Sequence, residues 1–373
     1  MHNHLLLSTY PPRRCGIATF THSLVHALEE RAPSLRGEIL AVHDDDVQPC
    51  DYPSRVIMRL PRNERLAYRA AAAFINDHPA PVLNVQHEFG IFGGPHGSWL
   101  LDLLHRVRKP VALTLHGVPP SPTFERRTLV RDLCERAAKV VVLSQTARRL
   151  LETQYFIGSE FVEVIPHGAP DVAFTSTAAA KTSLGLEGRF VASTFGFRER
   201  RNGIELALDG IAAVARRHPE VLCLMIGPTH PAAQTIERLG LSHNVTIVNE
   251  NLAPNDLLRY LLASDACIMP YADEAHAVSA VLACAMAAGK PVISTPYLYA
   301  REMLAGGRGM LVPFNDGRSI AGALTFLIQD PVSRAVIAQR AYARGRSMIW
   351  SEVARRYAQL LQAMETEDRA VIA

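Results

Sequence analysis

Short apolar runs alternate with helical patterns along almost the whole chain. In the first half, the runs that predict strands lie at 5–8, 38–42, 82–86, 111–116, 140–143 and 163–166. Segments with helical spacing separate them, at 19–31, 64–77, 97–106, 125–138 and 145–154. Apolar strands that alternate with helices are typical of parallel sheets covered by helices. The first half of the chain therefore predicts an α/β domain.

A second series of the same kind follows. Its strands are predicted at 190–194, 221–226, 245–248, 266–269 and 291–294, and its helices at 203–217, 254–263 and 279–288. The stretch 169–186 is small and polar without a clear period, which is typical of a linker. We therefore expect two domains, at 1–170 and 187–345. An amphipathic pattern at 350–364 predicts a last helix.

Composition narrows the class of protein. A chain of 373 residues with 48% hydrophobic residues is long enough for two buried cores. A net charge of +3 argues against a dedicated nucleic-acid binder. The six cysteines are scattered without a CxxC pair, which is typical of reduced, buried thiols. No run approaches the ~20 apolar residues that span a bilayer. We expect a cytoplasmic protein.

The first strand leads into a loop with the features of an anion site. The sequence TYPPRRCGIATF at 9–20 joins this strand to the first helix. Gly16 allows close approach of a ligand to the backbone, and the amides at a helix start favour anions. Arg13 and Arg14 add positive charge. A tight turn with solvated arginines is the alternative, and Cys15 is interpreted as a small packed residue.

Two more strands of the first half end in polar residues. Glu88 lies in VQHEFG at 85–90, and His116 lies in TLHG at 114–117. A histidine at a strand end can donate to a phosphate or a sugar hydroxyl, or accept a proton from an attacking hydroxyl. Each residue, considered singly, could equally be a satisfied polar group of the core. Both are candidate catalytic residues.

The second half carries a basic loop at 194–203, TFGFRERRNG, and a dense motif region at 270–313. A guanidinium binds phosphate bidentately, so Arg198 and Arg201 are candidate phosphate ligands. The alternative is a solvated loop that caps the helix starting at Gly203. In the motif region, small polar groups at the end of a strand and the start of a helix are further candidates. They are Ser279, Thr295 and Tyr297, with His276 as a candidate near the reacting group.

These motifs together resemble the retaining GT-B glycosyltransferases of the large fourth family, in the subgroup with a PPRxCGIATFT loop. The resemblance extends from Thr9 to about Trp350. It implies an α/β fold of the GT-B type, with two Rossmann-like domains whose parallel sheets face a central cleft. It further implies that the first domain binds the acceptor, that the second binds the nucleotide-sugar donor, and that the C-terminal helix 350–364 packs back on the first domain.

The resemblance also assigns roles to single residues. Residues implied to bind the donor are Gly16, Arg198, Arg201, Asn202, Ser279, Thr295 and Tyr297. Those implied to lie near the transferred sugar are His116, His276 and Glu88. The chain departs from the family pattern at four positions: Phe197 and Asn202 replace an arginine and a lysine, and His276 and Cys284 replace two glutamates. Cys284 is a poor ribose ligand because a thiol is a weak donor and acceptor.

The expected function is retaining transfer of a hexose from a nucleotide-sugar to a hydroxyl acceptor, without a metal or another cofactor. The acidic run 44–46 is interpreted as a solvated loop rather than a metal site, and the pair His22 and His26 lacks a third ligand. Two alternatives stay open: a catalytically silent GT-B protein that binds an active enzyme, and a sugar-nucleotide epimerase. No nucleic-acid partner is expected; a peripheral membrane or protein partner stays open.

Overall fold

The computed structural model describes residues 2–31, 35–44, 51–195, 203–227, 232–248, 254–275 and 278–372. The chain divides into two compact units. Unit 1 consists of Met1–Gly168 and Trp350–Ala373, and unit 2 consists of Ala169–Ile349. Each unit contains one sheet, and all the strand pairs recorded in both sheets are parallel.

Unit 1 has a seven-stranded sheet in the order β3-β2-β1-β4-β5-β6-β7. Its strands are β1 (His2–Ser8), β2 (Leu35–His43), β3 (Val56–Pro61), β4 (Leu83–His87), β5 (Val111–Leu115), β6 (Lys139–Val142) and β7 (Val162–Val164). Its helices are α1 (Gly16–Arg31), α2 (Arg65–Asp77), α3 (Trp99–Leu104), α4 (Phe124–Arg136), α5 (Gln145–Tyr155) and α14 (Trp350–Ile372), with short 3-10 turns η1 (Pro95–Gly97) and η2 (Ser159–Phe161).

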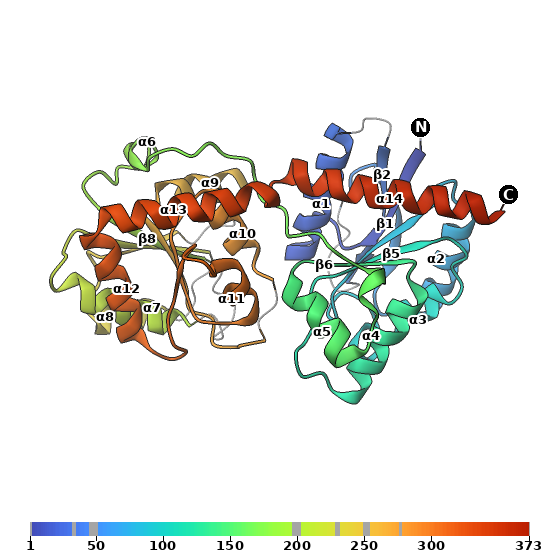
Figure 1. Ribbon diagram of the computed structural model, residues 1–373, viewed down its shortest axis with the longest axis horizontal. Coiled ribbons are helices and arrows are strands. Elements are labelled where there is room, and N and C mark those ends of the chain that lie inside the picture. The colour runs from blue at the N-terminus through green and yellow to red at the C-terminus, as the bar shows by residue number, and fades with distance from the viewer. Residues whose placement is uncertain are drawn as a thin grey trace. The chain divides into compact units, whose positions relative to one another are not determined.

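Helices cover both faces of this sheet because successive residues of a strand point to opposite faces. On β1, Leu5 and Leu7 pack with α2, α3, α4 and α5, whereas Leu6 packs toward α1. On β5 and β6, Ala112 and Val141 pack with α1 and α14. The C-terminal helix α14 therefore lies beside α1 and completes the second face of the sheet of unit 1 (Figure 1).

Unit 2 has a six-stranded sheet in the order β10-β9-β8-β11-β12-β13. Its strands are β8 (Phe190–Phe195), β9 (Val221–Ile226), β10 (Val245–Val248), β11 (Ala266–Met269), β12 (Val292–Ser294) and β13 (Met310–Leu311). Its helices are α6 (Ala178–Thr182), α7 (Ile204–Ala215), α8 (Ala232–Arg238), α9 (Pro254–Ala263), α10 (Ala280–Ala287), α11 (Leu298–Leu304), α12 (Gly317–Gln329), α13 (Pro331–Gly345) and the 3-10 turn η4 (Arg346–Met348).

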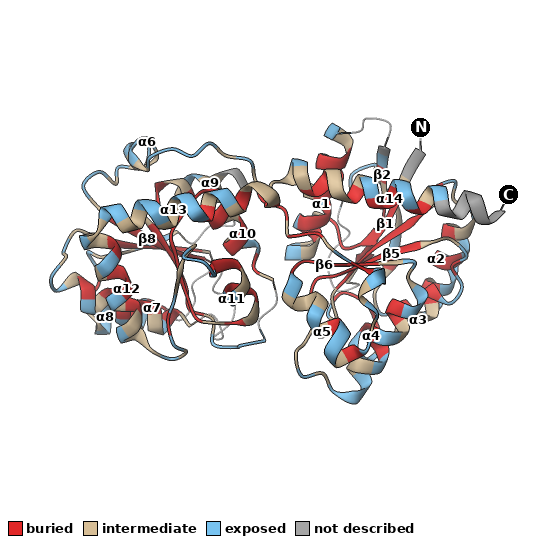
Figure 2. Ribbon diagram, in the orientation of Figure 1, coloured by how far each residue is buried: buried red, intermediate tan, exposed pale blue. Residues whose placement is uncertain are grey.

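The inner strands of both sheets are almost entirely buried, while the surrounding helices expose their outer faces (Figure 2). In unit 2 the alternation along a strand again separates two cores. Cys267 and Met269 of β11 face α10 and α11, and Ile268 faces α7 and α12. Strands buried on both faces read as continuous apolar runs, which is why the sequence identified them well.

The structure also contains elements that the sequence pattern did not predict. Strand β3 follows a proline and lies at the edge of the sheet, where its residues are only partly buried. Helices α12 and α13 follow each other directly and share the cap residue Asp330, which accepts from the backbone of Ser333. An edge strand gives a weak periodic signal, and so does α13, which buries only Ala341 and Gly345. Helix α12 has an apolar face at helical spacing that the sequence analysis missed.

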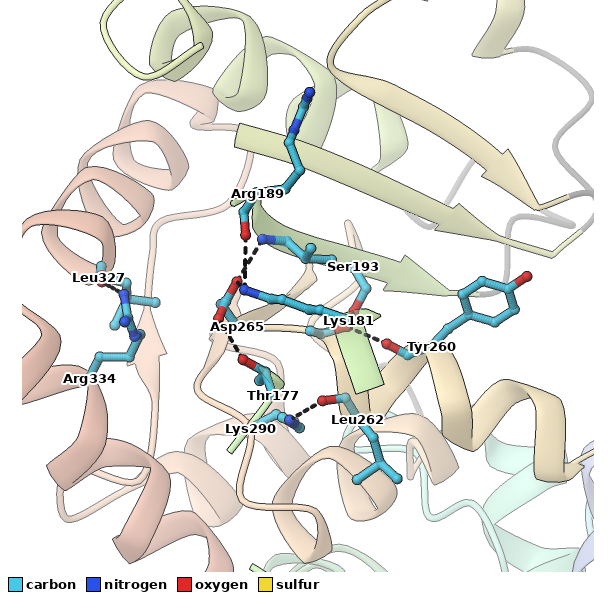
Figure 3. Close-up of polar contacts among 12 residues, drawn as sticks. Thr177, Lys181, Arg189, Ser193, Tyr260, Leu262, Asp265, Lys290, Leu327 and Arg334 are labelled. Carbon is cyan, nitrogen blue, oxygen red and sulfur yellow. Dashed lines mark hydrogen bonds and ion pairs between the residues drawn. The ribbon is translucent and has the colours of Figure 1, made fainter. Parts of the chain in front are cut away.

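Residues 169–186, which the sequence predicted to be a linker, form part of unit 2. Lys181 of α6 lies 2.6 Å from a carboxylate oxygen of Asp265, and the backbone N–H of Val191 donates to the same oxygen at 2.7 Å. Thr177 donates to the other oxygen at 3.3 Å (Figure 3). Asp265 directly precedes β11, so this network fastens the segment to the amino ends of β8 and β11.

Within the described residues, no single helix is both long and apolar enough to cross a membrane. One bent pair, Gly317–Gln329 with Pro331–Met348 at 103°, meets the length and composition test.

Two glycines of unit 2 allow a test of how tightly the carboxyl end of its sheet is packed. Gly203 caps α7 with a φ of 61°, and a Cβ there would overlap the carbonyl oxygen of Pro270. Gly240 has a similar φ of 68°, but no atom lies within 4 Å of the corresponding Cβ. Gly240→Ala should therefore cost only the left-handed backbone strain, about 1–2 kcal/mol.

Gly203→Ala should cost that strain and about 1–3 kcal/mol more, because the added methyl group collides with backbone. The measurement is the free energy of unfolding of both variants in urea. Equal losses in the two variants would mean that the backbone of Pro270 does not press on Gly203.

Candidate functional site

The strand order of unit 1 reverses between β1 and β4, which lie side by side at the middle of the sheet. In open α/β sheets, ligands bind outside the carboxyl ends of the strands at such a reversal. Three residues that the sequence singled out lie at this edge. Gly16 is the first residue of α1, Glu88 follows β4 directly, and His116 follows β5 directly.

His116 is held by a chain of buried polar groups. Its Nε2 lies 2.8 Å from Oε1 of Gln86, whose amide nitrogen donates to Asn84 at 2.7 Å and to Thr114 at 3.3 Å. The hydroxyls of Thr114 and Tyr357 are 3.0 Å apart. Since Tyr357 belongs to α14, this chain joins β4, β5 and the C-terminal helix.

The hydrogen-bond chain also defines the protonation state of His116. Gln86 uses its amide protons on Asn84 and Thr114, so its Oε1 accepts from His116 Nε2–H. The Nδ1 atom is then left with a lone pair. The pKa of His116 is lowered to about 3, mainly by burial and to a lesser extent by the neighbouring His167 and His87. His116 is therefore a neutral hydrogen-bond acceptor at pH 7.

Two further histidines surround this position. His87 ends β4 and is fully buried between the rings of Phe89 and Phe92, and burial lowers its pKa to about 4. His167 lies three residues after β7, and burial lowers its pKa to about 4 as well. The sequence analysis did not assign His167. The sequence feature that points to His167 is PHG at 166–168, which follows a predicted strand and contains the same His-Gly pair as His116 and Gly117.

The other groups of this edge have partners within unit 1. Glu88 accepts from the backbone of Gly90 at 2.7 Å, which closes a tight turn. Arg13 forms an ion pair with Asp44 at 2.8 Å, and Arg62 pairs with the same carboxylate at 3.1 Å. Asp44, the described residue of the acidic run, is thus neutralised by arginines.

The backbone at the start of α1 is accessible to solvent. Gly16 is exposed, and no atom lies within 4 Å of the position that a Cβ would take. Cys15 precedes it, with its sulfur 3.2 Å from the Thr9 hydroxyl and 3.4 Å from the backbone nitrogen of Ala18. Cys15 therefore helps to cap the helix and leaves space for a ligand beside Gly16.

In unit 2, the predicted donor-binding residues Ser279, Thr295 and Tyr297 lie at the carboxyl ends of β11 and β12, and all three are buried. Ser279 caps α10 by accepting from Leu282 at 3.2 Å. Thr295 donates to the carbonyl of Tyr271 at 2.6 Å. The polar groups of Ser279 and Thr295 stabilise this edge of the sheet, and the contact of all three residues with a donor stays a prediction.

Cys284 lies on α10 and packs against the core of unit 2, and burial raises the pKa of its thiol to about 12. The other predicted residues of this unit lie outside the described residues; they are Arg198, Arg201, Asn202 and His276. Within the described ranges, no group of three or more His, Cys, Asp or Glu side chains could hold a metal ion.

Both halves of the chain match glycosyltransferase families. The sequence model described as Glycosyltransferase Family 4 matches residues 15–171, and the one described as Glycosyl transferases group 1 matches residues 189–330. The phosphatidyl-myo-inositol mannosyltransferase of Mycolicibacterium smegmatis is 28% identical over 272 residues, which cover 72% of this chain and 68% of that protein.

Solved structures share the fold over almost the whole chain. Sucrose-phosphate synthase of Thermosynechococcus elongatus superposes with a TM-score of 0.78 at 19% identity, covering 98% of this chain and all of that one. Anabaena HepE in complex with UDP-glucose gives a TM-score of 0.72 at 17% identity over 96% of this chain and 99% of that one. The two parallel-sheet, Rossmann-like units thus form the fold of GT-B glycosyltransferases, as the sequence predicted.

Three histidines with lowered pKa values, His87, His116 and His167, make the stability of unit 1 sensitive to acid. Their pKa values in the folded protein are about 3 to 4, below the ordinary value of 6.5. Between these values the unfolded chain binds more protons than the folded one, so the free energy of unfolding falls as the pH falls from 6.5 toward 4. A single histidine shifted to about 4 accounts for about 2 kcal/mol at pH 5.

His87→Leu removes one of these rings, and no described residue hydrogen-bonds the ring of His87. We expect the loss of unfolding free energy between pH 7 and pH 5 to be smaller by about 2 kcal/mol in this variant. The exposed His243 provides the control, because His243→Asn should behave as the unchanged protein. Urea unfolding at both pH values measures the difference, and identical acid losses in all three proteins would contradict the assignment.

Proposed function

We propose that this protein is a metal-independent retaining glycosyltransferase that moves a hexose from a nucleotide-sugar to a hydroxyl acceptor. One observation carries the proposal: the two halves match two glycosyltransferase families separately, and each half is a complete parallel-sheet unit. In this proposal one unit binds the acceptor and the other binds the donor.

Unit 1 supplies the groups for the acceptor. A histidine with a pKa of about 3 is a poor base at pH 7, so His116 orients the attacking hydroxyl by accepting its hydrogen bond. The hydroxyl proton then leaves with the departing diphosphate, on the same face of the sugar. The exposed backbone at Gly16 favours an anionic group at the start of α1.

Unit 2 supplies the groups for the donor. Its basic loop contains Arg198 and Arg201, whose guanidinium groups match the geometry of a diphosphate. Stabilisation of the leaving diphosphate would supply most of the rate enhancement. The mannosyltransferase relative and the HepE complex with UDP-glucose support a nucleotide-hexose as the donor.

A catalytically silent GT-B protein is the second candidate. The observation that favours it is the use of the polar groups in unit 2: Ser279 and Thr295 are engaged in internal hydrogen bonds, and Cys284 packs where most of the family has a glutamate. A silent protein would keep the fold and lose the donor. Binding of a nucleotide therefore separates the two candidates.

The first test of the proposal is a thermal-shift panel with UDP, GDP, ADP, CMP and dTDP. A ligand at 100 times its dissociation constant stabilises the fold by about 2.7 kcal/mol. We expect one nucleotide to raise the melting temperature, and the double variant Arg198→Ala with Arg201→Ala to abolish the shift. Arg200→Ala, in the same loop, is the matched control and should keep it. No shift with any nucleotide favours the silent protein.

The stereochemistry is tested with the sugar donor of the base that the panel identifies. Proton NMR recorded during the first turnovers should show the anomeric configuration of the donor in the product, because a retaining enzyme transfers to the face that the diphosphate leaves. A product of the opposite configuration would rule out a retaining mechanism while leaving glycosyl transfer intact.

A further inference from the structure

We propose that His116 and His167 form a paired site that accepts hydrogen bonds from two hydroxyl groups of one polyol and rejects phosphate groups that carry no hydroxyl. The inference deepens the proposed function, on which it rests, because the polyol would be the acceptor or the sugar itself. It adds His167 as a residue that positions the ligand. It also names polyols as the chemical class of ligand that binds at this edge of unit 1.

The two rings are fixed against the same side chain. Phe20, in the first turns of α1, contacts His116 edge-on with ring centroids 4.6 Å apart, and contacts His167 edge-on at 5.1 Å. Phe20 itself is buried in the core between α1 and α14. Both imidazoles therefore pack on one rigid ring, although they come from the ends of different strands.

The hydrogen-bond partners determine which nitrogen of each ring is free. Nδ1 of His167 lies 2.7 Å from the carbonyl oxygen of Gly168, and a carbonyl only accepts, so Nδ1 carries the proton and Nε2 carries a lone pair. His116 donates through Nε2 to Gln86, which leaves the lone pair on Nδ1. Among the described residues, no donor hydrogen-bonds to either of these two free nitrogens.

The backbone beside His167 is held as firmly as its ring. A Cβ on Gly168 would overlap the ring of Trp350, which also lies 5.2 Å from Phe20 and 6.1 Å from His167 between centroids. The chain therefore passes His167 in one conformation, with its Nδ1 proton committed to the backbone. Rotation of the ring would leave that carbonyl without its donor.

Two neutral rings that both present lone pairs select the ligand by charge. An oxygen of a phosphate diester or of a diphosphate bridge carries only lone pairs and negative charge, so it is repelled by an acceptor nitrogen that stays unprotonated at pH 7. A hydroxyl group donates to the same nitrogen. Two such acceptors packed on one rigid ring can accept from two hydroxyls of a hexose or a cyclitol. This differs from the expectation from sequence alone, in which His116 could also donate to a phosphate.

The decisive experiment is nitrogen-15 NMR of the unchanged protein with labelled histidines. The free protein should show His116 protonated at Nε2 and His167 at Nδ1. Titration with glucose or myo-inositol should then shift the resonances of His116 Nδ1 and His167 Nε2 together, while dimethyl phosphate, an anion without a hydroxyl donor, should leave both unchanged. A shift caused by dimethyl phosphate, or no shift with either polyol, would overturn the proposal.

Variants at position 167 test the role in transfer. His167→Phe keeps a flat ring and removes the acceptor nitrogen, and it should raise the KM for the acceptor about tenfold, the equivalent of one hydrogen bond. The KM for the donor should stay constant, and His167→Gln, which retains an acceptor oxygen, should recover part of the loss. A purely structural role would instead change kcat and the melting temperature without this split.

Failure of this inference can be told apart from failure of the proposed function. If a nucleotide binds but neither polyol shifts the two nitrogens, glycosyl transfer stands and the histidine pair is wrong. If both nitrogens respond to a polyol but no nucleotide binds, the paired site is supported and the proposed transferase activity is not. The NMR titration needs neither a donor nor a variant, so it decides the inference by itself.

Discussion

The buried amide of Gln86 is the interaction on which unit 1 depends. It lies in the middle of the sheet, where a polar group without a partner would cost about 1–3 kcal/mol. Its amide nitrogen donates to Asn84 of the same strand and to Thr114 of β5, and its oxygen accepts from His116. Thr114 extends the chain to Tyr357. One network therefore docks the C-terminal helix and fixes the protonation of the candidate catalytic histidine.

The hydrogen bonds around Gln86 hold the ring of His116 in one orientation. Hydrogen bonds in a low-dielectric interior are strong when all partners are present and costly when one is missing. His116 cannot rotate without breaking its bond to Gln86. The neutral state of the ring, the orientation of its free nitrogen and the packing of α14 therefore change together or not at all.

Much of the fold could be predicted because the strands are buried on both faces and leave continuous apolar runs. Edge strand β3 lacks that signal, and the segment before β8 was predicted to be a linker because its contacts with unit 2 join positions far apart in the chain, such as Lys181 with Asp265. The roles of polar side chains were harder to predict. Nothing local in the sequence shows that His167 reaches Phe20, since this contact joins positions 147 residues apart in the chain.

The two units differ in the charge of the side chains that they can offer to a ligand. Burial keeps His116 and His167 neutral, so these two rings can accept hydrogen bonds from hydroxyls but do not offer positive charge to a diphosphate. In the proposed function, the loop of unit 2 that contains three arginines supplies positive charge to the leaving diphosphate. The proposal therefore divides the reaction between a neutral site for hydroxyls in unit 1 and a cationic loop for phosphates in unit 2. In this proposal, His276 and Cys284 in place of the two family glutamates alter the contacts to sugar and ribose, while the arginines of the loop keep positive charge for the leaving group.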